Sequence, residues 1–141
     1  MRAQRLVTAF ALTRLAMPYL AFVVLRRWLA LETLTRWAWR PPKQPRNRRD
    51  EVLVAARVTR LSQLMMRGAD CLPRSLLLYR ELSRRGADPH LVIGFADASR
   101  ALVGHAWVTL DGQPLGESAS TLAPLTPVCV FGAGGRVLDV P

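Results

Sequence analysis

Three side chains in this sequence have the types and the order that cysteine-dependent acyl transfer requires. Cys71 stands in the run DCLPRS, His105 in the run GHAWV, and Glu117 in the run LGES. In such chemistry a thiolate attacks a carbonyl, an imidazole moves the proton, and a carboxylate orients the ring. The elements that carry these three residues must therefore bring them to one place.

A helix is predicted to begin at the cysteine. Asp70 is a good N-cap residue, Pro73 is tolerated in a first turn, and Gly86 is a natural stop after two arginines. Cys71 would then be the first helical residue, where the helix dipole favours the thiolate. A small buried side chain is the commoner role of a free cysteine, so Cys71 alone favours that structural role.

His105 is predicted to lie on a strand that is followed by a hairpin. Residues 91–95 and 105–110 are rich in strand-forming residues, and His105 and Trp107 fall on one face of the second segment. Asp111 and Gly112 together are a hairpin signal. The alternative role of His105 is that of an ordinary half-buried strand residue.

The length of the hairpin loop decides whether Glu117 can face His105. A two-residue loop would leave Glu117 opposite Ala106, on the wrong face. A three-residue loop over 110–112 would pair Glu117 with His105, with Cβ atoms about 4.5–5.5 Å apart. We choose the three-residue loop because the chemistry needs it. Asp111 lies at the turn tip, roughly 20 Å along the strand from His105, so we expect it to be a turn residue only.

The runs CLPRSL, LVIG and HAWV, in this order and at this spacing, resemble the transglutaminase-like cysteine proteases. They are most similar to the stand-alone leader peptidases of bacterial lasso-peptide biosynthesis, over about residues 57–118. The resemblance implies a papain-like core with a Cys-His-Asp triad, in which Cys71 is the nucleophile, His105 the base, and Glu117 stands where aspartate is usual. It also implies three partners: a leader-binding protein, the lasso precursor peptide and an ATP-dependent cyclase.

Composition limits the other possibilities. A chain of 141 residues suggests one core, and its two cysteines have no zinc-site spacing, so neither a metal nor a cofactor is expected. Cys129 lies in an apolar run, and we expect it to be structural. A disulfide between Cys71 and Cys129 is conceivable, but no paired spacing supports it. No phosphate-binding loop is present, which argues against ATP chemistry in this chain.

The N-terminal third carries most of the charge. Residues 1–50 hold eleven Lys or Arg and two acids, a net charge of +9, whereas residues 51–141 have a net charge of +1. We predict an apolar and basic helical segment over 1–40, a Pro/Arg-rich linker over 41–50, and a cysteine peptidase domain over 51–141. Such basicity can attract acidic peptide, anionic lipid, nucleic acid or a partner protein.

Residues 6–25 have the length of a membrane span but contain Arg14 and Pro18. We expect two helices that break near Pro18 and pack on protein, with contact to a membrane surface as the second choice. A further helix is predicted from Val54 to Met65 and ended by Gly68. Gln63 on that helix is a weak candidate for an oxyanion donor. Residues 128–131 and 136–140 are expected to be two closing strands.

The sequence therefore predicts an α+β fold with a papain- or transglutaminase-like core, in which the nucleophile begins a helix packed on a small antiparallel sheet, behind an N-terminal helical segment. The leading hypothesis is a cytoplasmic cysteine peptidase that removes the leader from a lasso-peptide precursor and has no nucleic-acid partner. One alternative keeps the triad but uses an amine acceptor, which gives an amide-forming transglutaminase. The other is a basic membrane- or nucleic-acid-associated adaptor on a degenerate protease fold.

Overall fold

The computed structural model describes residues 2–66, 70–98 and 101–140. Within these residues the chain forms five α-helices, one short 3₁₀ helix and a five-stranded antiparallel sheet, so the α+β prediction is confirmed. The helices are α1 (Arg2–Leu25), α2 (Leu31–Ala38), α3 (Arg48–Met66), α4 (Cys71–Arg84), α5 (Ala119–Leu122) and the 3₁₀ helix η1 (Ala133–Gly135). The strands are β1 (His90–Ala98), β2 (Ala101–Leu110), β3 (Gln113–Pro114), β4 (Thr126–Phe131) and β5 (Val137–Leu138), in the spatial order β3-β2-β1-β4-β5.

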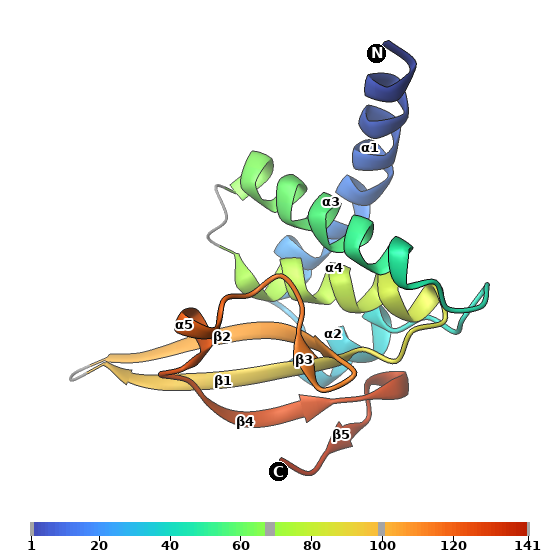
Figure 1. The fold of residues 1–141 in the computed structure, drawn as a ribbon. Helices are drawn as coiled ribbons and strands as arrows, with labels where there is room; N and C mark the ends of the chain where they lie inside the picture. The colour runs from blue at the N-terminus through green and yellow to red at the C-terminus, as the bar shows by residue number, and fades with distance from the viewer. Residues whose placement is uncertain (1, 67–69, 99–100, 141) are drawn as a thin grey trace.

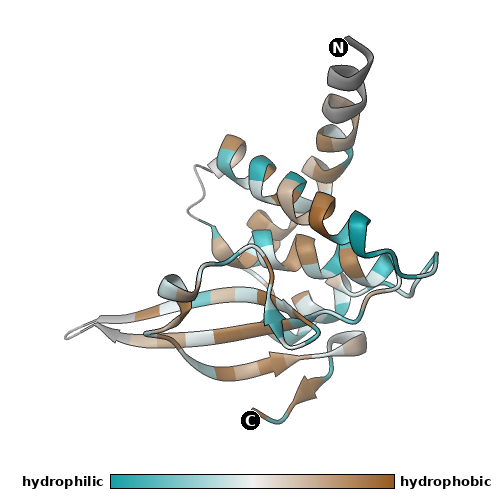
Figure 2. Cartoon of the chain, in the orientation of Figure 1, coloured by the Kyte–Doolittle hydropathy of each residue, from teal (hydrophilic) through white to brown (hydrophobic). Residues whose placement is uncertain are grey.

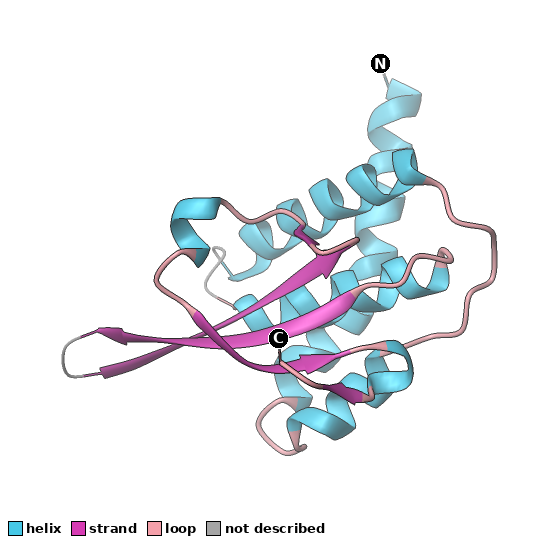
Figure 3. Cartoon of the chain, turned by 60° about the horizontal axis from the view of Figure 1, so that its bottom comes forward, coloured by secondary structure: helices cyan, strands magenta, loops and turns pink. Residues whose placement is uncertain are grey.

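Helix α4 lies at the centre of the fold, and both α1 and α3 pack against it on the helical side (Figures 1 and 3). Most of its residues are buried because helices cover one side and β2 covers the other. Its end follows the expected glycine stop. Gly86 has a φ of +80°, and Ala87 and Gly86 donate to the carbonyls of Leu82 and Ser83, which are the two bonds of a Schellman motif.

The two faces of the sheet contact different partners. Leu91, Val108 and Phe131 belong to the main core that the helices share. On the opposite face Val92, Trp107 and Val130 form a smaller cluster, which Leu122, Leu125 and Leu138 partly cover. Figure 2 shows hydrophobic residues along the strands and on α4, and hydrophilic residues where α3 begins. Successive residues of β2 thus belong to opposite faces of the sheet. This confirms the prediction that β2 presents His105 and Trp107 on one face and Ala106 and Val108 on the other.

The predicted break at Pro18 is wrong, because α1 is one helix from Arg2 to Leu25. An interior proline removes one helical hydrogen bond and disfavours the helix locally. Here Leu15, Tyr19 and Phe22 are buried in the main core on either side of Pro18. Their packing therefore outweighs the local preference of one residue. None of the helices formed by the described residues is long and apolar enough to cross a membrane.

The predicted linker is in contact with the rest of the chain. The amide of Lys43 donates to the carbonyl of Arg84 at 2.9 Å, and α3 already begins at Arg48. Leu34 of α2 is also buried in the main core. The division into a segment, a linker and a domain stays a prediction, although all three parts contact one another. The helix predicted around Val54 and the two closing strands are confirmed, whereas Gly68 lies outside the described residues.

Candidate active site

Cys71 is the first residue of α4, as the sequence predicts. Its thiol is free and half-buried. The side chain of Asp70, however, makes no capping hydrogen bond, so that part of the prediction is wrong. Its Oδ1 instead accepts from the guanidinium of Arg26 at 2.5 Å, because a charge-assisted bond outweighs a neutral amide donor. The Oδ2 atom of Asp70 is buried and has no partner among the described residues.

His105 lies on β2 next to a fixed aromatic ring. The rings of His105 and Trp107 are stacked, with centroids 6.1 Å apart and an interplanar angle of 20°. The Trp107 ring in turn covers Gly94 of β1, where an added Cβ would lie only 2.7 Å from the ring. Glycine at position 94 is therefore required for the tryptophan to lie flat on the sheet beside the histidine.

The three-residue loop that we chose for the β2–β3 hairpin is wrong. Leu110 pairs with Gln113, so the loop has two residues. Asp111 has a φ of 53° and Gly112 a φ of 75°, and both angles lie in the left-handed region that a type I′ turn requires. This turn matches the right-handed twist of the strands, which explains why the shorter loop is adopted.

Glu117 nevertheless reaches His105, by a route other than strand register. The strand β3 ends at Pro114, and Gly116 has a φ of 75° that turns the chain out of the ladder. The Oε1 atom of Glu117 then lies 3.3 Å from Nε2 of His105. Only 10% of the Glu117 side chain and 20% of the His105 side chain are exposed, so the pair is largely shielded from water.

The first turn of α4 is tied to the same place. The guanidinium of Arg74 forms an ion pair with Oε1 of Glu117, the oxygen that also contacts His105. One residue further, Oγ of Ser75 donates to the carbonyl of Ala106 at 2.9 Å. Arg74 is a site residue that the sequence did not predict. Its position three residues after Cys71, on the same side of the helix, is the signal that could have indicated one.

The structure therefore brings two of the three predicted site residues into direct contact. His105 contacts Glu117, whereas none of the side-chain hydrogen bonds within the described residues joins the thiol of Cys71 to His105. The link between Cys71 and the pair runs through the first turn of α4 and Arg74. Hydrogen bonds between catalytic groups are often longer in unliganded enzymes than in their substrate complexes.

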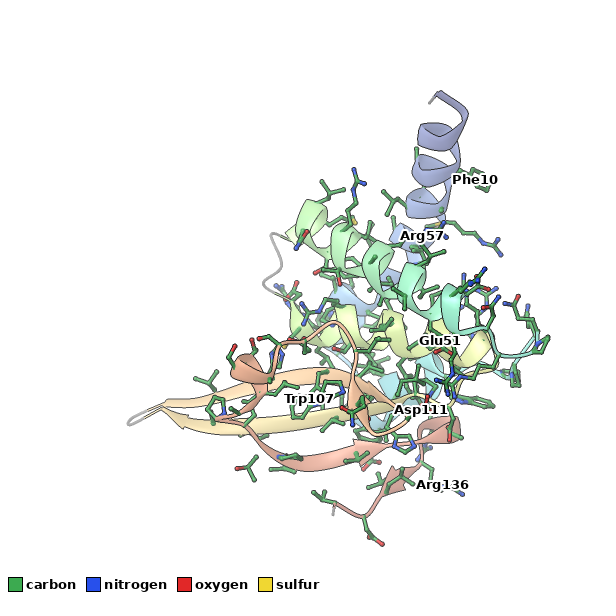
Figure 4. All side chains as sticks on the ribbon, viewed as in Figure 1. Phe10, Glu51, Arg57, Trp107, Asp111 and Arg136 are labelled. Atoms are coloured by element: carbon green, nitrogen blue, oxygen red, sulfur yellow. The ribbon has the colours of Figure 1, made fainter. Side chains whose placement is uncertain are left out.

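Asp111 has a structural environment. Its carboxylate accepts two hydrogen bonds from Arg46, at 2.5 and 2.8 Å, and Arg46 also binds Glu51 at 2.6 Å. The hydrogen bond from Arg46 lowers the pKa of Asp111. Figure 4 shows Asp111 at the hairpin turn, and Glu51 belongs to the start of α3. This network joins the tip of the hairpin to the helices.

The remaining candidates lie in less reactive surroundings. Cys129 is on β4, packs against the main core, and has a pKa raised by burial. Both cysteines are free thiols. Gln63 is exposed on α3. Among the described residues, no group of three or more His, Cys, Asp or Glu side chains is arranged to hold a metal ion.

Comparison with known proteins gives one match. Residues 16–130 match the family model of the transglutaminase-like superfamily. The match includes Cys71, His105 and Glu117, and the C-terminal part of α1 as well. Neither the curated proteins nor the solved structures contain a match to this chain.

Proposed function

Because this chain belongs to the transglutaminase-like superfamily, we propose that it is a cysteine peptidase with Cys71, His105 and Glu117 as its catalytic residues. The superfamily supports a cysteine-dependent enzyme of the protease or transglutaminase type. The observation that carries the assignment of residues is the contact between Nε2 of His105 and Oε1 of Glu117, beside a helix that begins with a cysteine.

The proposed reaction begins with proton transfer from the thiol. Since Nε2 of His105 faces the carboxylate, Nδ1 is the nitrogen left to accept the proton of Cys71. The thiolate attacks the scissile carbonyl, and the backbone N–H of Cys71 can donate to the oxyanion because first-turn amides have no helical partner. The tetrahedral intermediate collapses as the imidazolium protonates the leaving amine. Water then hydrolyses the thioester with His105 as base, which restores the thiol.

Glu117 has two functions in this proposal. Its negative charge stabilises the imidazolium that forms when His105 takes the proton. Its second contact, to Arg74, holds the carboxylate between β2 and the first turn of α4. Because the same oxygen contacts both cations, Arg74 fixes the orientation of the carboxylate. Arg74 also neutralises part of its negative charge, which weakens the attraction between the carboxylate and the imidazolium. Aspartate is the usual residue, and the glutamate reaches the ring here from outside the strand ladder.

The proposed substrate is the precursor of a lasso peptide, from which the enzyme removes the leader. The order and spacing of the runs around Cys71 and His105 support this choice. A leader-binding protein and an ATP-dependent cyclase are the proposed partners. A ribosomally made precursor places the reaction in the cytoplasm, and the net charge of +9 on residues 1–50 could add peripheral contact with anionic lipid.

The nucleophile is tested by Cys71→Ala. We expect this variant to lose leader cleavage and to keep its fold. Cleavage is measured by mass spectrometry of the precursor in the presence of the leader-binding protein. Iodoacetamide should also label Cys71 faster than Cys129 near neutral pH, because burial raises the pKa of Cys129 and leaves it less thiolate. Full activity of Cys71→Ala would refute the assignment. Equal, slow labelling of both thiols would favour the non-enzymatic adaptor.

The family itself supports one second candidate, an amide-forming transglutaminase. The two reactions share the thioester and differ in the acceptor that attacks it. Incubation of precursor with a small primary amine separates them, because hydrolysis adds water to the acyl product, whereas aminolysis adds the amine.

A further inference from the structure

A concave site lies at the end of α4 that is opposite to Cys71. A groove of about 900 Å³ opens between α1, α2, the start of α3 and the C-terminal half of α4. Cys71 and Arg84 are the first and last residues of α4, and a helix of this length separates them by roughly 20 Å. The groove is therefore distinct from the site of His105 and Glu117.

The groove has an apolar surface that is left open by the described residues. Leu15 and Phe22 of α1 are buried beneath it, whereas three large side chains at its wall are open to solvent. These are Phe10, Met17 and Trp37, which are 75%, 78% and 53% exposed. Figure 4 shows Phe10 on the projecting part of α1. Exposed apolar side chains gathered around a hollow are typical of a binding surface.

The groove is also strongly basic. Five cations line it without a carboxylate within salt-bridge distance in the described part of the chain: Arg14, Arg40, Lys43, Arg57 and Arg80. Glu81, the acidic residue of the lining, is already paired with Arg84 and Arg85. The site therefore combines an apolar surface with an excess of unneutralised positive charge.

Arg80 is the lining cation with an unsatisfied buried donor. Its Nε atom is buried and has no hydrogen-bond partner among the described residues, and its NH1 makes only a long contact of 3.5 Å to the carbonyl of Trp37. Burial, and then the like charge of Arg40, lower the pKa of Arg80. A buried donor left unsatisfied is costly, and a carboxylate in the groove would satisfy it and offset the repulsion.

We propose that this groove binds an acidic, amphipathic segment of the peptide substrate, away from the bond that is cut. The inference rests on the peptidase function proposed above. A short peptide fits a hollow of this volume, whereas a folded partner needs about 800 Å² of surface on each side and a membrane surface is too flat to fill a groove. At about 3.3 Å per extended residue, roughly six residues would separate the bound segment from the scissile bond.

Binding can be measured without turnover. The probe is a fluorescein-labelled synthetic 12-residue peptide with four Glu and four Leu residues, and the matched probe has Gln in place of each Glu. Fluorescence polarisation with the full chain should show binding of the Glu peptide that weakens as salt is added, and at least tenfold weaker binding of the Gln peptide.

The groove is tested by the double variant Arg40→Glu/Arg57→Glu. Its matched control is Arg60→Glu/Arg136→Glu, which changes the net charge equally at two exposed residues outside the groove. We expect the groove variant to lose at least about tenfold in affinity for the Glu peptide and the control to change less than about threefold. Circular dichroism establishes that both variants are folded.

Three results would overturn the proposal. Equal losses in both variants would show a general charge effect, and equal binding of the Glu and Gln peptides would show that carboxylates are not recognised. The third result is a groove variant that no longer co-sediments with phosphatidylserine-containing vesicles, although the control does and peptide binding is unchanged. That result would assign the surface to lipid. If the chain bound the peptide but Cys71 were unreactive, the proposed binding groove would stand and the proposed peptidase function would be refuted.

Discussion

At the scale of single residues, the proposed triad depends on the carboxylate of Glu117, which lies outside the strands of the sheet. Glu117→Gln keeps the shape of the side chain and removes its charge. We expect kcat to fall by about 10²–10⁴, because the imidazolium loses its stabilising partner, as it does when the aspartate of a serine-protease triad is replaced by asparagine. Steady-state kinetics on the precursor provide the measurement.

Asp111→Asn is the matched control for that loss of charge. Asn tolerates the positive φ of residue 111, and the change affects only the exposed network with Arg46. We expect kcat within about twofold of the wild type. If Asp111→Asn abolished activity and Glu117→Gln did not, the assignment of the third catalytic residue would be wrong.

Arg74 is proposed as a positioning residue. Arg74→Gln should leave Glu117 free to turn away from His105, and we expect kcat to fall about tenfold with KM nearly unchanged. Arg74→Lys keeps the charge and should restore part of the activity. The pH profile of kcat should also shift in Arg74→Gln, because a cation next to the pair is removed. A rise in KM together with the fall in kcat, with no pH shift, would indicate a purely structural role.

At the scale of elements, the position of α4 is fixed by polar contacts as well as by apolar packing. Ser75 joins its first turn to β2, and Tyr79 joins its middle to η1. The hydroxyl of Tyr79 donates to the carbonyl of Gly132 and accepts from the N–H of Gly135 at 3.1 Å. The end of the sheet and α4 therefore form one connected unit.

Tyr79→Phe removes both bonds, after which the N–H of Gly135 and the carbonyl of Gly132 keep only the hydrogen bond of 3.1 Å that they make to each other. We expect the free energy of unfolding to fall by about 1–3 kcal/mol, measured by urea denaturation.

The pH dependence of stability gives a second readout. Burial raises the pKa of Tyr79 to about 12, above the value near 10 of an unfolded chain. Its stabilising contribution is therefore complete below about pH 10 and is lost as the pH rises towards 12. Tyr79→Phe should show a shallower alkaline loss over this range. An identical alkaline curve in both proteins would contradict this account of Tyr79.

At the scale of the whole molecule, α1 is part of the core. Tyr19 is fully buried between α1 and the other helices, whereas Met17 on the same helix is 78% exposed. Tyr19→Ala should lower the free energy of unfolding by about 3–5 kcal/mol, and Met17→Ala should change it by less than about 0.5 kcal/mol. Thermal or urea unfolding provides both values. A larger effect at Met17 than at Tyr19 would refute the packing of α1 on protein.

The sequence by itself determined most of the local structure. The four- and three-residue steps of apolar residues gave α3, and Pro73 and Gly86 marked the start and end of α4. The alternation of residues along 105–110 gave the correct faces of β2. These predictions succeeded because helix periodicity, strand alternation and glycine stops act within one element.

Tertiary structure decided what those local signals leave open. Packing in the core keeps α1 helical across Pro18. The carboxylate of Asp70 binds Arg26 and does not cap α4, as the sequence had predicted it would. A two-residue turn replaced the predicted loop, and Glu117 still met His105 because Gly116 turned the chain out of the ladder and Arg74 bound it from another element. The turn of Asp111 and Gly112 is local, whereas the packing of α1, the bond from Arg26 and the bond from Arg74 depend on partners far away in the sequence, which neither spacing nor propensity within one element specifies.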